Sequence, residues 1–88
     1  MTETVHDLGA LRALREVGRQ GSIAAAASVL GVSQQALSAR MRTLERAMEV
    51  TLLARTPSGS RLTEQGRLVV GWAEDVLDAA QFDQPVRH

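Results

Sequence analysis

The stretch Ser22–Ser38, SIAAAASVLGVSQQALS, decides the fold of this 88-residue chain. Two runs of helix-forming residues lie on either side of Gly31, and a serine precedes each run. Serine is a preferred N-cap because its hydroxyl accepts a hydrogen bond from a free backbone N–H of the first turn. Glycine tolerates the left-handed backbone conformation in which many helices end. The stretch therefore predicts a helix-turn-helix, a unit that places its second helix in the major groove of DNA.

The first helix of the pair, predicted over residues 23–30, contains four consecutive alanines. Alanine has the highest helix propensity and little bulk, so it lets another helix approach closely. We expect Leu30 to lie on the buried side of this helix and Val32 to fill the turn. The alternative is an alanine-rich surface helix that simply ends at Gly31.

The second helix is predicted from Gln34 to about Met48. Leu37, Met41, Leu44 and Met48 recur every three or four residues, so they predict one buried face. Glutamine can pair with adenine edges, and arginine can bind guanine or phosphate. The opposite face offers such groups in a row: Gln34, Gln35, Ser38, Ala39, Arg42 and Arg46. The alternative is an ordinary solvated helix face, which has the same composition. The helix-turn that precedes this helix is what favours contact with DNA.

A short hairpin, or wing, is predicted after the second helix. Residues 51–55 and 61–63 have the apolar and β-branched character of strands, and TPSGS at 56–60 is typical of a turn. Arg55 and Arg61 flank this turn and are candidates for phosphate contacts, which position a protein on DNA without reading its sequence. The alternative for each arginine is a solvated loop position.

A last helix is predicted from the N-cap Thr63 to about Ala80. Leu62 and Leu68 are expected to face back onto the winged domain. An apolar stripe would remain uncovered and predicts a dimer interface, formed by Val69, Trp72, Ala73, Val76, Leu77 and Ala80. Trp72 is the only tryptophan and the candidate anchor of that interface. The alternative is that this helix folds back and buries Trp72 in the chain's own core.

The front of the chain is simpler. Residues 1–7 have the character of a short tail. Leu8, Leu11 and Leu14 predict a helix that ends within residues 18–21 and braces the alanine-rich helix.

Composition excludes several classes of function. The chain has no cysteine and therefore no disulfide, thiol chemistry or zinc-finger ligands. His6 and His88 lie near the termini, and the sequence has no nucleophile–base pair and no glycine-rich phosphate loop, so we expect no enzyme, cofactor or metal. No apolar run reaches membrane-spanning length and no signal peptide is present, so we expect a cytoplasmic location. Only Trp72 and Phe82 are aromatic, which argues against stacking on single strands.

The formal net charge is zero, but the charges are unevenly distributed. Residues 33–61 carry five arginines against two glutamates, a net +3. Residues 62–88 carry two arginines against five acidic residues, a net −3. This asymmetry directs phosphate toward the second helix and the wing and away from the last helix.

With these residues in view, the chain resembles the N-terminal DNA-binding domain of LysR-type transcriptional regulators over roughly residues 8–77. The matches keep a fixed order and spacing: GSI at 21–23, AA at 26–27, Leu30, VSQ at 32–34, ALS at 36–38, Met41, LE at 44–45, Leu52, Arg55, LTE at 62–64 and Gly66. The resemblance implies a mainly α fold. Three helices and a short two-stranded wing would form a winged helix-turn-helix, and a long linker helix that dimerises would follow.

The resemblance also implies which residues contact DNA. The family's base and phosphate contacts fall on Ser33, Gln34, Gln35, Ser38, Ala39 and Arg42 of the second helix, and on Arg55 and Arg61 around the wing. Three positions depart from the family pattern. Gln35 replaces a usual proline, Ala39 replaces a longer polar residue, and Met48-Glu49 replaces leucine-glycine, so the turn into the wing is expected to differ.

The expected organisation is a DNA-binding domain over residues 1–62, a linker helix for dimerisation over 63–82, and a tail or shortened linker over 83–88. The resemblance implies a bacterial regulator that binds an inverted-repeat operator as a dimer, with tetramers in a longer protein. It implies a small-molecule effector only where a further domain is present. We expect a fragment of such a regulator, with a naturally short regulator as the alternative. A DNA-binding domain of a molybdate-responsive regulator, or a helical interaction module without a DNA role, also remains open.

Overall fold

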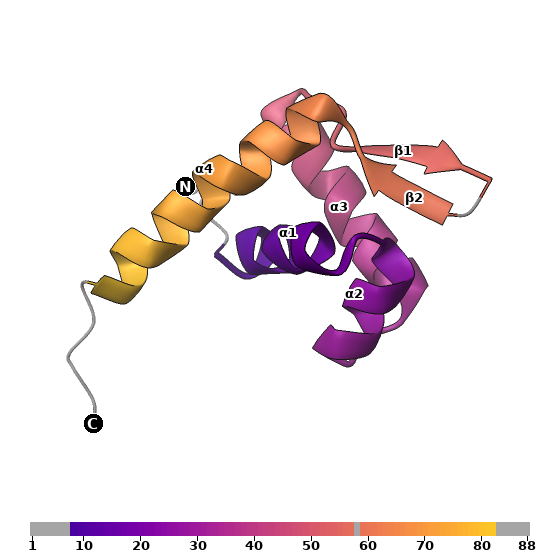
Figure 1. Cartoon of the computed structure of the whole chain (residues 1–88), viewed down its shortest axis with the longest axis horizontal. Helices are drawn as coiled ribbons and strands as arrows, with labels where there is room; N and C mark the ends of the chain where they lie inside the picture. Colours follow the sequence, from indigo (N-terminus) through magenta and orange to yellow (C-terminus); the bar gives the residue numbers. More distant parts are fainter. Residues whose placement is uncertain (1–7, 58, 83–88) are drawn as a thin grey trace.

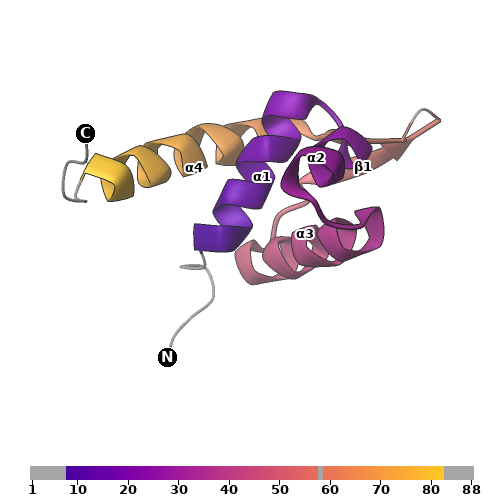
Figure 2. The same ribbon diagram turned by 90° about the horizontal axis from the view of Figure 1, so that it is seen from below.

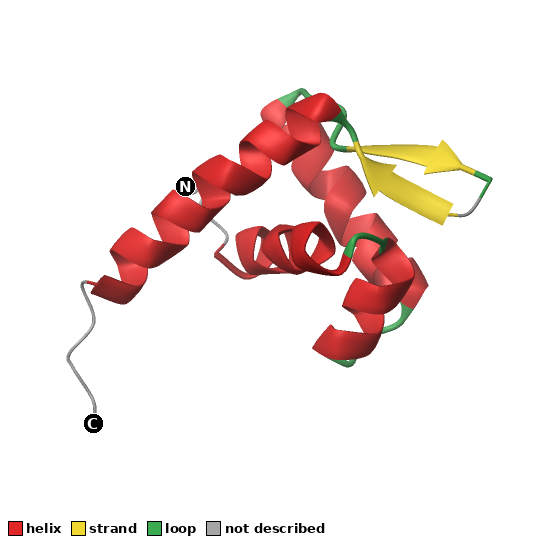
Figure 3. Cartoon of the chain, in the orientation of Figure 1, coloured by secondary structure: helices red, strands yellow, loops and turns green. Residues whose placement is uncertain are grey.

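The computed structural model describes residues 8–57 and 59–82, and these form four helices and a two-stranded antiparallel sheet (Figure 1; Figure 3). The elements are α1 (Leu8–Gln20), α2 (Ile23–Leu30), α3 (Gln34–Met48), β1 (Leu53–Thr56), β2 (Gly59–Leu62) and α4 (Glu64–Phe82). The expected fold class, a mainly helical winged helix-turn-helix followed by a long helix, is confirmed. The expected tails at residues 1–7 and 83–88 lie outside the described residues.

The caps of the helix pair form as the sequence predicts. Ser22 Oγ accepts from the Ala25 N–H at 3.1 Å, and Ser33 Oγ accepts from the Ala36 N–H at 3.0 Å. Gly31 has φ 74°, the left-handed conformation of a helix end. Ser22 and Gly31 therefore mark the two ends of α2, and Ser33 marks the start of α3.

The small residues of α2 allow the three N-terminal helices to pack around one core. Ala26 and Ala27 are fully buried there with Leu14 and Val17 of α1. A larger side chain at either alanine would push the helices apart, because protein interiors are close-packed. The helix pair therefore owes its tight geometry to the alanine run, as expected.

Two apolar residues at the turn are not buried, contrary to expectation. Leu30 is 38% exposed and Val32 is 46% exposed. Both line a hollow of 340 Å³ that opens beside Ala13, Leu37 and Arg40 instead of joining the core. The buried side of α2 is formed by Ile23, Ala26 and Ala27, and the last turn of α2 with Leu30 lies outside the core.

The wing is a hairpin in which Leu53 pairs with Leu62 and Thr56 pairs with Gly59. Its first strand begins two residues later than predicted, because Leu52 is fully buried in the core and serves as the anchor of the hairpin. The Thr63 N–H donates to the Leu52 carbonyl at 2.9 Å and closes the base. The wing thus projects from a base that is fixed to the core (Figure 1).

Helix α4 starts at the predicted cap and runs beside α1 (Figure 1; Figure 2). Thr63 Oγ1 accepts from the Gly66 N–H at 2.8 Å. Leu62 packs against the main core as expected. Leu68 does not, because it is 72% exposed. Leu68 lies five positions before the buried Ala73. This offset places it about 140° around the helix from the side that faces α1.

Helix α3 ends at Glu49, which adopts the left-handed conformation at φ 59° and ψ 40°. The Glu49 N–H donates to the Glu45 carbonyl. The glutamate that stands in place of the expected glycine therefore still forms a left-handed cap. For a residue with a Cβ this conformation costs roughly 1–2 kcal/mol. A negative side chain at a helix C-terminus is also unfavourable.

We therefore expect Glu49→Gly to raise the free energy of unfolding by about 0.5–1 kcal/mol, since glycine removes both penalties but gains freedom in the unfolded chain. Urea unfolding followed by circular dichroism measures the change. A midpoint at or below that of the unsubstituted chain would show that Glu49 is not strained in the native state.

Candidate nucleic-acid interface

Helix α3 presents a free polar face to solvent. Its apolar stripe faces the core, with Leu37, Met41 and Leu44 each at most 3% exposed, while Met48 at the end of the helix is only partly buried. The predicted DNA-contacting residues lie on the other side, and all are exposed apart from the partly buried Ser38: Gln34, Gln35, Ser38, Ala39, Arg42 and Arg46. A face of this kind has room for a double helix to dock, which a buried face would not have.

The N-terminal turn of α3 is positioned to enter a groove first. Ser33, Gln34 and Gln35 are all exposed, and Ser33 caps the helix through its side chain. In helix-turn-helix proteins the N-terminal residues of the reading helix contact base edges. The structure thus places both glutamines at the end of α3 where readout of bases is expected.

A cleft separates α3 from the wing, and its walls carry residues that lie far apart in sequence. The hollow measures 180 Å³, with Ser38, Arg42 and Glu45 on the side of α3 and Arg55 and Ser60 on the side of the wing. Arg42 and Arg55, predicted separately, therefore face the same hollow. Two guanidinium groups in one concave surface favour a bound phosphate.

The two wing arginines occupy opposite faces of the hairpin. Arg55 pairs with Ser60 and Ala54 pairs with Arg61, and side chains alternate between the faces along a strand. Arg61 is exposed but does not line the cleft. Ser60 was not predicted as a site residue, although its register opposite Arg55 places it there. Only the pairing of the strands, which no short motif specifies, identifies it.

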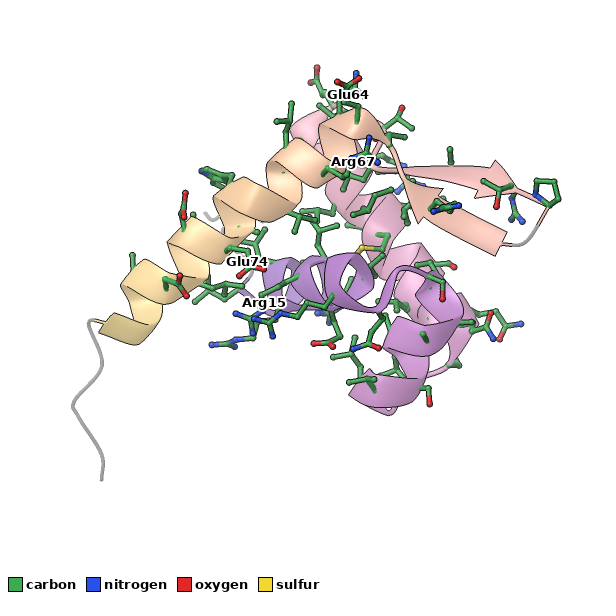
Figure 4. All side chains as sticks on the ribbon, viewed as in Figure 1. Arg15, Glu64, Arg67 and Glu74 are labelled. Carbon is green, nitrogen blue, oxygen red and sulfur yellow. The ribbon has the colours of Figure 1, made fainter. Side chains whose placement is uncertain are left out.

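Glu74 of α4 lies away from this interface, whereas Glu64 begins α4 next to the base of the wing. Glu74 belongs to the part of α4 that runs along α1, on the side of the molecule away from the wing (Figure 4). Arg19 Nη2 lies 3.8 Å from Glu74 Oε1, and both side chains are substantially exposed, so this ion pair contributes little to stability. Glu64 and Arg67 lie at the start of α4 (Figure 4). The predicted separation of charge therefore holds in space for Glu74 but not for Glu64, which lies beside the base of the wing.

The predicted apolar stripe of α4 is divided between two surfaces. Ala73 and Leu77 are buried against Leu11 of α1, and Val76 packs beside them. Val69 is partly buried against the main core. Trp72 is 45% exposed, and the side chain of Ala80 lies outside the described residues. Among the side chains of α4 that the structure describes, the large exposed apolar ones are Leu68 and Trp72, which we call the α4 patch.

Two further kinds of site were sought among the described residues. These residues contain no group of three or more histidine, cysteine or acidic residues arranged to hold a metal ion. No helix among them has the length and apolar character needed to cross a bilayer. The α3 face and the adjoining cleft remain the strongest candidates for function.

Comparisons with known proteins agree with this geometry. Residues 8–67 match the family model described as bacterial regulatory helix-turn-helix protein, lysR family. An uncharacterized HTH-type transcriptional regulator of Mycobacterium tuberculosis is 41% identical over 64 residues, which are 73% of this chain and 20% of that protein. The chain spans about a quarter or less of the lengths of the curated relatives that it matches.

Solved structures of protein–DNA complexes share the fold. The DNA-binding domain of CbnR, crystallised with DNA, superposes with a TM-score of 0.78 at 34% identity, and the match covers 84% of this chain and 85% of that one. The DNA-binding domain of BenM bound to catB site 1 DNA gives a TM-score of 0.76 at 27% identity, over 84% of this chain and 80% of that one.

Proposed function

This chain belongs to the lysR family of bacterial regulatory helix-turn-helix proteins, and we propose that it reads an inverted-repeat DNA operator as a homodimer. It is a DNA-binding domain of the LysR type. Its proposed role is transcriptional regulation in the bacterial cytoplasm, with no catalytic activity of its own. The CbnR and BenM domains that share its fold were crystallised with DNA, which supports duplex DNA as the ligand.

The observation that carries this proposal is the exposed polar face of α3 beside the cleft. A helix of this width fits the major groove of B-form DNA. With α3 in the groove, the cleft between Arg42 and Arg55 lies against the sugar-phosphate backbone that borders it. Arg61, on the other face of the wing, is positioned for a further phosphate. We assign base readout to Gln34, Gln35 and Ser38 and phosphate contacts to Ser33 and the arginines, with Ala39 against a base edge.

The α4 patch supports the proposed dimer. Leu68 and Trp72 are large apolar side chains exposed side by side on one helix, and burial of such residues drives association. Val69 and Val76 flank the patch and remain partly exposed. A symmetric pair joined through α4 would carry two reading helices, whose separation sets the spacing of the half-sites. Pairs of such dimers in a longer protein, and a small-molecule effector bound by a further domain, are extensions of this proposal.

Gln34→Ala and Gln35→Ala test the assignment of base readout. Each is expected to relax preference at one base pair by about 1–3 kcal/mol, because a bidentate contact to adenine is lost while phosphate contacts remain. In vitro selection of duplexes with the purified chain and each variant measures the preference. Gln65→Ala, at an exposed glutamine of α4, is the matched control and should select the unsubstituted consensus. Unchanged selection by both α3 variants would remove the glutamines from base readout.

The sequence alone left open a helical interaction module without a DNA role, and the family match over residues 8–67 argues against it. Binding to a random-sequence DNA duplex at several salt concentrations separates the two functions. A DNA-binding domain gives an affinity that falls steeply with salt because counterions are released from phosphates. A module without phosphate contacts gives no binding and no slope.

A further inference from the structure

Glu45 joins the reading helix α3 to the base of the wing. Its Oε2 accepts hydrogen bonds from the Leu52 N–H at 2.8 Å and from the Leu53 N–H at 3.0 Å. Leu52 is the buried anchor of the hairpin, and Leu53 is the first residue of β1. Hydrogen bonds to an ionised carboxylate are shorter and stronger than neutral ones. The carboxylate therefore fixes the point at which the wing leaves the globule.

The other hydrogen bonds at the base of the wing connect different segments. The Thr63 N–H donates to the Leu52 carbonyl, and Thr63 Oγ1 donates to the Thr51 carbonyl. These bonds hold the two ends of the hairpin to each other. The bonds from Glu45 hold the hairpin to α3, so they set the angle and the distance between the reading helix and the wing.

The same carboxylate lies in a surface that is otherwise suited to phosphate. Glu45 lines the cleft together with Arg42 and Arg55. A negative charge so close to a bound phosphate is electrostatically unfavourable. Contact with DNA therefore does not explain an acidic residue at this position, whereas its two backbone bonds to the wing do.

We propose that Glu45 is a positioning residue for DNA binding, which holds Arg55 of the wing opposite Arg42 of α3 so that both contact one phosphate backbone. This inference rests on the proposed function, since it concerns how the same interface grips DNA. Glu45 itself does not touch the ligand. It acts through the position of the wing.

Glu45→Ala separates a positioning role of Glu45 from a purely electrostatic one, because the two roles predict opposite changes in the affinity for DNA. Removal of a negative charge near phosphate would by itself tighten binding to a random-sequence DNA duplex. Loss of the positioning bonds instead weakens it, by roughly tenfold at low salt, and lowers the slope of log affinity against log salt by about one, because one phosphate contact is lost. Glu49→Gln removes one negative charge four residues further along α3 and is the charge control. It should bind as tightly as the unsubstituted chain or slightly tighter.

A double-mutant cycle with Arg55 identifies the path of the effect. Arg55→Ala alone should lower the salt slope by about one. In the Glu45→Ala background the same change should have almost no further effect, because the misplaced wing no longer delivers that arginine. Glu45→Gln keeps one acceptor oxygen for the two N–H groups, so its affinity for DNA should lie between those of Glu45→Ala and the unsubstituted chain. If Glu45→Ala folds poorly, the partial loss of affinity in Glu45→Gln still tests the proposal.

A distance measurement without DNA tests the positioning directly. The chain has no cysteine, so Ala47→Cys on α3 and Ala54→Cys on β1, both at exposed positions, accept spin labels selectively. We expect a narrow distribution of label distances that broadens in Glu45→Ala and not in Glu49→Gln. If the unsubstituted chain fails to bind duplex DNA, the proposed function falls while this measurement still decides the role of Glu45. Unchanged label distances, or tighter DNA binding by Glu45→Ala, would overturn the inference.

Discussion

Gly66→Ala is expected to destabilise the chain by about 3 kcal/mol, enough to unfold a domain of this size under mild conditions. A Cβ on Gly66 would overlap the backbone carbonyl of Leu52 and would lie only 3.0 Å from Leu62 Cδ2. The carbonyl has no room to retreat, because Leu52 is fully buried and its oxygen accepts from the Thr63 N–H. Relief of the overlap would move the first turn of α4 away from the wing base.

Gly71→Ala is the matched control for this substitution. Gly71 lies one and a half turns further along α4, and an added Cβ there meets nothing within 4 Å. Alanine favours the helix over glycine by about 1 kcal/mol at such a position, so this variant should become more stable. Urea unfolding of both variants measures the contrast. A Gly66→Ala chain as stable as the unsubstituted one would show that α4 does not dock closely on the wing base.

The double variant Leu68→Glu and Trp72→Glu is expected to lower the affinity for an inverted-repeat duplex by roughly 100-fold to 10,000-fold. Two carboxylates in the α4 patch would prevent two copies from burying it, so each half-site would bind independently and the advantage of linkage would be lost. Affinity for a single half-site should stay unchanged, because neither residue lies on α3 or the wing.

Sedimentation equilibrium measures the mass in solution, and we expect a dimer for the unsubstituted chain and a monomer for the double variant. Val29→Glu is the control, since Val29 is also exposed and apolar, at 59%, but lies on α2. It should leave the mass unchanged. A dimeric double variant, or equal loss of full-site and half-site binding, would contradict a dimer formed through α4.

Local chemistry explains why much of this fold was predictable. Ser22, Gly31 and Ser33 act on backbone groups within three or four residues, so their identity alone predicted the helix ends that the structure shows. The stripe of α3 was equally reliable, because Leu37 and Met41 repeat at the period of the helix. The polar face of α3 followed from that stripe by exclusion.

The missed features depend on contacts between distant segments. Leu30 and Leu68 are apolar and have helical spacing, yet whether such a residue is covered depends on where the neighbouring element ends. Glu45 bonds residues seven and eight positions away, and Gly66 packs against a carbonyl fourteen positions earlier. A one-dimensional pattern carries no information about these pairings, so the cleft and its positioning residue became visible only in the structure.

The free face of α3 is expected to dock into duplex DNA, and an NMR titration follows this docking residue by residue. The isotope-labelled chain is titrated with a duplex obtained by in vitro selection, and backbone amide shifts are followed residue by residue. We expect the largest changes at residues 33–46 and in the wing around Arg55, with little change along the part of α4 that packs on α1. Changes confined to α1 and α4, with the amides of α3 unmoved at saturating DNA, would contradict this expectation.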